Sequence, residues 1–227
     1  MLRMLIADWN SDSGSLLSAG IIVLSYALLL FVMMPVHELG HAFAAYKLGD
    51  PTAKLEGRLT FNPIAHFDKI GTLMILLIGI GYAKPVPVNP RYFRNPNRDM
   101  ALTALAGPLS NLLMAIASVG IFALIAPFIK DVMVFNCLYI VFIGVFASVN
   151  LGLMVFNLLP IHPFDGSRIF FALLPQKWAW KMQKYRMYVS LILFVIVMAG
   201  LLDGPLNWIE HTVGGLICRM FGLPNLF

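Results

Sequence analysis

Charged residues are scarce in this chain of 227 residues, since only 12% are Asp, Glu, Lys or Arg, whereas a soluble domain carries about 25%. Hydrophobic residues make up 59% of the chain, and the mean hydropathy is +0.82. These values exclude an ordinary soluble domain and predict a protein for which lipid is the main solvent.

Cysteine is also rare, and the two present, Cys137 and Cys218, lie in apolar runs without C-x-x-C spacing. This pattern excludes a disulfide framework and a cysteine-based zinc knuckle. No tract of interleaved basic and aromatic residues suggests nucleic-acid binding, so the net charge of +5 indicates membrane topology instead. No small-residue cleavage site follows the first apolar run, which we therefore interpret as an uncleaved anchor.

Long charge-free runs predict the membrane spans, because about 17–25 residues cross the hydrocarbon core. Four runs approach this length: 13–36, 100–129, 132–161 and the marginal 187–202. A glycine-rich run at 70–83 is too short for a straight span and predicts a re-entrant or interfacial segment. The tail from residue 204 is consistent with either a last span or an interfacial helix.

Two stretches between the first spans favour extended structure. Residues 54–61 alternate polar and apolar side chains, as a half-buried strand does, and the prolines in 84–89 exclude a helix. The predicted fold is thus an all-α polytopic membrane protein. It has about four or five transmembrane helices and a short re-entrant or β-hairpin-like segment on the cytoplasmic side. No repeat or soluble domain interrupts residues 1–227, which predicts one membrane domain.

The distribution of Lys and Arg predicts the orientation. Residues 47–98 contain eight of these cations and residues 168–186 contain five, so thirteen of sixteen fall in two blocks that alternate spans place on one side. By the positive-inside rule that side is the cytoplasm. The N-terminus is therefore expected outside.

A His-Glu-Leu-Gly-His motif at residues 37–41 follows the first charge-free run directly. Two imidazoles four residues apart share one helix face, so His37 and His41 can bind one ion. Glu38, beside the first of them, can take a proton from a water at that ion. Such polar groups are costly at a membrane helix end unless they have a function. The alternatives are snorkelling polar residues and, for Glu38, a partner to an imidazole.

A catalytic zinc site needs a third protein ligand. Asp165 is favoured, because it lies in a turn framed by Pro163 and Gly166 that the third span brings to the same membrane face as the histidines. Its alternative role is to cap a helix that begins at Gly166. The other candidates for the third ligand are Asp50, Glu56, His66, Asp68, Asp99 and His162.

An amide inside the second long span is a further candidate. Asn111 ends the run Ala-Gly-Pro-Leu-Ser-Asn at 106–111, where Gly107 and Pro108 are expected to loosen the helix. Its side chain can donate to a developing oxyanion. An interhelical hydrogen bond is an equally good interpretation.

These pieces together resemble the site-2 protease family of intramembrane zinc metalloproteases. The resemblance rests on the motif at 37–41, the run at 106–111 and the run Asn-Leu-Leu-Pro-Ile-His-Pro-Phe-Asp-Gly at 157–166. It covers about residues 24–174. Phe164 replaces the leucine that usually precedes the aspartate in this family. Nothing resembles the PDZ or CBS domains of larger members, so the chain is similar to the minimal bacterial and archaeal form.

The resemblance implies one Zn²⁺ bound by His37, His41 and Asp165, with Glu38 as the general base and Asn111 holding substrate or oxyanion. It also implies a single-span transmembrane protein or peptide as substrate, cut near the cytoplasmic face of a bacterial or archaeal membrane. We hypothesise that residues 54–61 or 84–89 pair with the unwound substrate by strand addition. Helices within 187–227 would form a gate.

Three other functions are compatible with the same polar cluster. A metal or ion transporter also places acids and histidines in broken helices, although no paired half-repeats are visible. A non-catalytic binder of membrane helices would not need Glu38. A metalloprotease of another type would use Glu56 as its third ligand.

Overall fold

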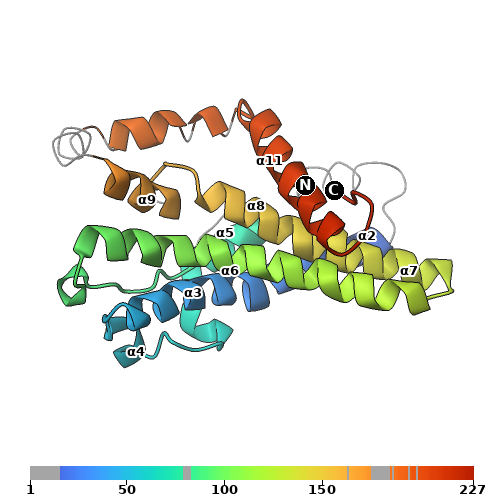
Figure 1. Ribbon diagram of the computed structural model, residues 1–227, viewed down its shortest axis with the longest axis horizontal. Coiled ribbons are helices and arrows are strands. Elements are labelled where there is room, and N and C mark those ends of the chain that lie inside the picture. The colour runs from blue at the N-terminus through green and yellow to red at the C-terminus, as the bar shows by residue number, and fades with distance from the viewer. Residues whose placement is uncertain are drawn as a thin grey trace.

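The computed structural model describes residues 16–78, 83–162, 164–174, 185, 187–193, 195–197 and 199–227 (Figure 1). Every regular element in these ranges is a helix, and they contain no strand. The start of the first predicted span, residues 79–82 of the short apolar run, and residues 194 and 198 of the 187–202 run lie outside the described residues.

Three of the described helices are long and apolar enough to cross a membrane: Val23–Lys47, Pro96–Phe128 and Val132–Asn157. They match the predicted spans 13–36, 100–129 and 132–161. A shorter apolar helix, Met187–Val197, covers the marginal fourth run. The described part of the chain therefore holds fewer candidate spans than the four or five predicted.

Each long helix is built from consecutive segments. The first contains α2 (Leu16–Leu28), a π-helical turn (Leu29–Met33) and α3 (Met34–Lys47). The second is α6 (Pro96–Ile125), which continues through Pro108 and ends in a 3₁₀ turn, Ala126–Phe128. The third contains α7 (Val132–Tyr139), a π-helical segment (Ile140–Ala147) and α8 (Ser148–Asn157).

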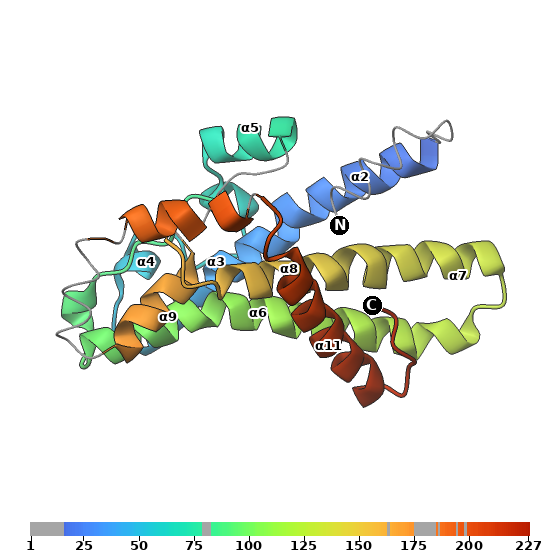
Figure 2. The same cartoon turned by 90° about the horizontal axis from the view of Figure 1, so that it is seen from above.

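Helix α6 is the central element of the bundle. It packs against α3, against α8 with the π-helical segment before it, and against α9 (Asp165–Leu173). The three long helices run along the long axis of the molecule, and the C-terminal ends of α3 and α8 lie at the same end as the start of α6 (Figures 1 and 2). The turn after α8 therefore arrives beside the histidine motif.

The apolar core lies between α6, α8 and α11 (Asp203–Met220). Its buried members include Val119, Phe122, Ile143 and Leu151, and Ile217 of α11 packs against them. This core fixes the distance between α6 and α8 well away from the polar end of the bundle.

The predicted strand at 54–61 is wrong. Its first residues belong to the short helix α4 (Thr52–Leu55), and the chain then turns at Gly57, whose φ is +68°. Asp50 accepts a hydrogen bond from the Thr52 amide at 3.0 Å, and this local capping favours a helical turn where no neighbouring strand offers a ladder. Residues 84–89 are extended, as predicted, but form no hairpin, so the β-hairpin-like alternative is also wrong.

Three short elements complete the polar end. They are a 3₁₀ turn, Pro63–His66, the apolar helix α5 (Lys69–Ile78) and a second 3₁₀ turn, Pro90–Tyr92. Helix α5 covers part of the predicted 70–83 run and stands apart from the long helices in Figure 2.

Small residues let α3 and α6 approach closely. A Cβ atom added at Gly40 would lie 2.8 Å from the Ala106 carbonyl oxygen and 3.2 Å from the Ser110 Cβ. Membrane helices pack through such small residues because lipid offers no hydrophobic force between them.

We predict that Gly40→Ala separates α3 from α6 and destabilises the protein by about 1–3 kcal/mol, the usual range for overpacking. Thermal unfolding in detergent measures the change. Gly144→Ala is the matched control, because nothing lies within 4 Å of a Cβ added there. Equal melting temperatures for the two variants would contradict the tight α3–α6 contact.

Candidate metal centre

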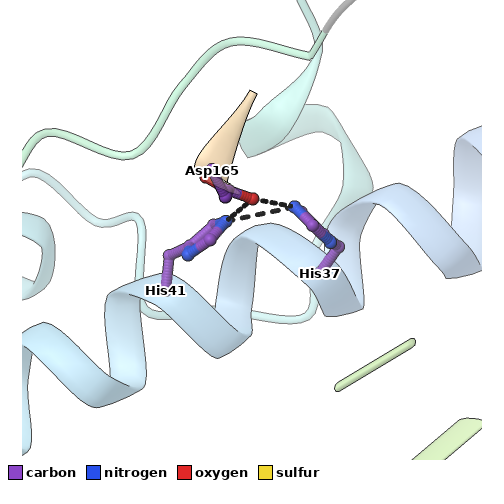
Figure 3. Close-up of side chains that lie close together, drawn as sticks. All are labelled: His37, His41 and Asp165. Atoms are coloured by element: carbon purple, nitrogen blue, oxygen red, sulfur yellow. Dashed lines mark hydrogen bonds and ion pairs between the residues drawn. The ribbon is translucent and has the colours of Figure 1, made fainter. Parts of the chain in front are cut away.

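Three side chains from two distant parts of the chain converge at the polar end of the bundle. The Nε2 atoms of His37 and His41 lie 3.1 Å apart, and each lies close to Asp165 Oδ2, at 3.2 Å and 3.1 Å respectively (Figure 3). Among the described residues, these three side chains form a group whose possible ligand atoms all lie within 4.8 Å of one another, close enough to hold a metal ion. His37 and His41 are buried, and Asp165 is half-buried.

The local sequence explains how each side chain reaches this point. His37 and His41 lie one helical turn apart on α3, so their rings project from the same face. Asp165 is the first residue of α9 and Phe164 occupies the N-cap position, so Asp165 does not have the alternative role of helix cap. Its carboxylate turns toward the imidazoles instead.

Helix α6 fixes both rings from behind. The Nδ1 atom of His41 donates to the Thr103 carbonyl oxygen at 2.8 Å, and the Nδ1 atom of His37 donates to Asn111 Oδ1 at 3.3 Å. Both acceptors are buried in α6. Such partners select the imidazole tautomer and orient the lone pair of the other nitrogen.

The chemistry of this group requires a cation. Because each Nδ1 faces an acceptor oxygen, each Nε2 carries a lone pair in the neutral ring. Two lone pairs and a carboxylate oxygen then face one another, which is unfavourable unless a positive charge lies among them. Zinc with tetrahedral bonds of about 2.0–2.2 Å separates its ligands by about 3.3–3.6 Å, slightly more than the observed spacing. The residues present therefore fit a zinc ion.

The surroundings of Asp165 favour its ionised form. Burial alone would raise the pKa of the Asp165 carboxyl, but where the rings carry a proton on Nε2 in place of a facing cation, hydrogen bonds from His37 and His41 and the charge on these rings outweigh it. The net pKa lies below the usual range for an aspartate. Asp165 is therefore available as an anionic ligand.

Two glycines give the ligands their space. A Cβ atom at Gly107 would overlap the His41 ring and come within 2.7 Å of Cε1 of His37. A Cβ atom at Gly166 would overlap the carbonyl groups of Leu158 and Leu159, so only glycine lets the Asp165 turn fold back on the end of α8.

Glu38 points to a different partner from the two histidines. Its Oε2 atom accepts a hydrogen bond from the Val86 amide at 3.2 Å, in the extended segment 84–89. The Nδ1 atoms of both imidazoles donate hydrogen bonds to α6, so Glu38 is not their hydrogen-bond partner. Its carboxylate therefore faces the side of α3 along which the segment 84–89 runs.

The other candidate ligands have separate roles. Asp50 and Asp99 are buried and accept backbone hydrogen bonds, Asp68 accepts from two amides at the start of α5, and His66 bonds the Thr60 carbonyl. Glu56 and His162 are exposed. None of these side chains belongs to the three-residue group.

Sequence reasoning missed the backbone partners of the site. The Thr103 carbonyl and the Val86 amide carry no side-chain signature, so no residue pattern could reveal them. Asn111 was identified as an oxyanion candidate, but its Oδ1 contacts His37, while its Nδ2 is buried without a hydrogen-bond partner among the described residues.

We predict that Asn111→Leu weakens zinc binding by about 10–100-fold, the usual effect of losing a partner that orients a metal ligand. Competition with a calibrated chelator measures the affinity. Asn150→Leu is the matched control, because Asn150 is also a fully buried amide but bonds only the Phe146 carbonyl on its own helix. Unchanged zinc affinity with a reduced turnover would favour the oxyanion role instead.

Comparison with known proteins agrees with this geometry. The profile described as "Peptidase family M50" matches residues 25–136 and 120–200. "Putative zinc metalloprotease YwhC" of Bacillus subtilis is 42% identical over 183 residues, which cover 78% of this chain and 83% of the relative. No solved structure matches significantly.

More distant relatives carry similar names. "Putative zinc metalloprotease Rip2" of Mycolicibacterium smegmatis is 30% identical over 58% of this chain and 50% of its own length. "Zinc metalloprotease MJ0392" of Methanocaldococcus jannaschii is 31% identical over 67% of this chain and 35% of its own length. With its apolar spanning helices and zinc-fitting group, the chain belongs to peptidase family M50, the site-2 protease family, and is an integral membrane zinc metalloprotease.

Proposed function

We propose that this protease hydrolyses peptide bonds of single-span transmembrane proteins or peptides, close to the cytoplasmic face of the membrane. One observation carries the proposal. The three ligand atoms gather on and beside the helix Val23–Lys47, which is long and apolar enough to span a bilayer. A metal group so placed lies within reach of a membrane-embedded helix and not only of soluble peptides.

The proposed orientation follows from charge. Thirteen of the sixteen Lys and Arg residues fall in 47–98 and 168–186, and the end of the bundle that carries α4 and α9 belongs to these blocks (Figure 1). By the positive-inside rule this end faces the cytoplasm of a bacterial or archaeal cell, and the N-terminus lies outside.

The proposed chemistry is the addition of water to the scissile carbonyl. Bound zinc supplies a Lewis acid that polarises this carbonyl and makes water easier to deprotonate. Glu38 takes one proton from the attacking water. As the C–N bond breaks, Glu38 returns this proton to the leaving nitrogen, giving a carboxylic acid and an amine; the acid then loses its remaining proton to the amine or to water. His37, His41 and Asp165 hold the metal, and Asn111 keeps the His37 ring in place.

A substrate helix must unwind before its carbonyls can react, because helical hydrogen bonds enclose them. We propose that residues 84–89 pair with the unwound segment by strand addition. The segment is extended, and the Val88 amide and Val86 carbonyl make no hydrogen bond to the described residues. Residues 54–61 form a helix and a turn, so we do not propose them for strand addition.

Two further contacts bear on the proposed re-entrant segment and gate. The Phe67 ring lies 5.5 Å from that of Phe31 in the first span, which supports a re-entrant path for the chain leading into α5. The amide of His162, which precedes Asp165 by three residues, donates to Ser190 Oγ on the helix Met187–Val197. This contact supports a gate in which that helix moves with the turn that carries the aspartate.

We predict that Glu38→Ala lowers cleavage of a single-span substrate by about 10²–10⁴-fold, the usual contribution of a general base. The variant should retain zinc, whereas Asp165→Asn should lose both zinc and cleavage, as a chelator does. Gel analysis of purified protein with substrate, together with elemental analysis, checks both outcomes. Glu56→Gln, an exposed carboxylate, is the control. A transporter or passive binder would leave the substrate intact in every lane.

We predict that Val88→Pro lowers kcat/KM by about 2–10-fold, since it removes one backbone hydrogen bond to the substrate worth about 0.5–1.5 kcal/mol. Val88→Ala keeps the amide and should stay near the wild type. Steady-state kinetics on a quenched fluorescent transmembrane peptide measures the difference. Equal kcat/KM for the two variants would count against strand addition.

A further inference from the structure

We infer that Asp50 and Arg58 are positioning residues, which hold the extended segment 84–89 against the Glu38 carboxylate and thereby fix the general base. The inference rests on the proposed function for the role of Glu38. Neither residue belongs to the metal group, and neither has a role in the chemistry described above.

The segment 84–89 cannot hold itself in place. Pro85 and Pro87 lack amide hydrogens, so the segment can form neither a helix nor a complete strand ladder. Asn89 accepts hydrogen bonds from the Arg91 and Tyr92 amides of the adjoining 3₁₀ turn. Beyond these, one backbone hydrogen bond reaches another described element, from the Lys84 amide to the His66 carbonyl at 2.9 Å, and the remaining polar contacts to described residues come from charged side chains.

Two buried charges supply these contacts. Asp50 is fully buried, and its Oδ2 accepts from the Asn89 amide at 2.7 Å. Arg58 is 4% exposed, and its Nη2 donates to the Pro85 carbonyl at 2.9 Å and to the Lys84 carbonyl. Neither makes an ion pair with a described residue. Burying unpaired charges is costly, so their shared use on one segment indicates a function for its position.

The residue that contacts Glu38 lies between the two ends of the segment that Arg58 and Asp50 hold. Arg58 holds the segment at residues 84 and 85, Asp50 holds it at 89, and the Val86 amide between them donates to Glu38. The Val86 side chain packs with Ala42 and Ala53, so the segment is also seated on α3 beside the motif. Among the described residues, the Val86 amide is the hydrogen-bond partner of the Glu38 carboxylate.

Kinetics of the full-length protein tests this arrangement. Asp50→Ala should lower kcat by about tenfold or more, because misplacing a catalytic group by about 1 Å costs up to about 10²-fold. Zinc content should be unchanged, and kcat should fall by a larger factor than KM rises, because the segment also pairs with the substrate. Asp99→Ala is the matched control, since Asp99 is also a buried carboxylate that accepts a backbone hydrogen bond, but from Asn95. It should lose stability without losing kcat.

A second pair of variants keeps the test valid if Asp50→Ala fails to fold. Val86→Pro removes the amide that contacts Glu38 in a segment already rich in proline, whereas Val86→Ala loses the same packing but keeps the amide. We expect kcat to fall much further in Val86→Pro, with zinc retained in both. Rescue of kcat in Asp50→Asn, which keeps an acceptor oxygen, supports the positioning role.

Hydrogen exchange gives a readout that does not require activity. In 84–89 only Lys84, Val86, Val88 and Asn89 carry exchangeable amides, so a peptide covering these residues reports on the segment. Exchange should accelerate in Asp50→Ala and in Glu38→Ala but not in Asp99→Ala. Unchanged exchange, or a kcat loss no larger than in the control variants, overturns the inference. A wild-type protein that cleaves no single-span substrate would overturn the proposed function alone.

Discussion

The close contact between α3 and α6 is the constraint on which the rest of the site depends. Gly40 and Gly107 remove the side chains that would separate the two helices, and the His37 and His41 rings then lie directly against the α6 backbone. At that distance one carbonyl and one amide oxygen of α6 reach the two Nδ1 atoms. The orientation of the metal-binding lone pairs is thus a consequence of helix packing.

The same packing explains how polar groups are tolerated in so apolar a chain. Each imidazole is satisfied on one side by α6 and on the other by the group that includes Asp165. The carboxylate arrives on a turn that only glycine permits, after the apolar core has fixed α8 beside α6. A buried charge costs least where hydrogen-bond partners or an opposite charge face it, and the three ligand candidates lie at such a place.

The proposed general base is held by different contacts from those that hold the two imidazoles. Glu38 contacts neither imidazole through a hydrogen bond but meets a proline-rich segment of the polar end. That segment is extended because proline prevents other structures, and it is seated by side chains from α3, from the turn after it and from Arg58. A segment held in this way can contact the catalytic residue through the Val86 amide and still present the Val86 carbonyl and the Val88 amide to a substrate, because alternate residues of an extended chain face the same edge.

The sequence alone predicted the three candidate spanning helices and the three side chains, His37, His41 and Asp165, that the fold brings together at one end of the bundle. These depend on local patterns: runs without charge, a four-residue helical spacing, and the alternation of spans that returns residue 165 to the side of residue 41. Tertiary structure decided the rest. It turned residues 54–61 into a helix and a turn, brought Asn111 to His37, and gave Thr103 and Val86 their roles through backbone atoms. Backbone groups are the same in every residue, so only the folded arrangement of the chain decides which of them meet a side chain.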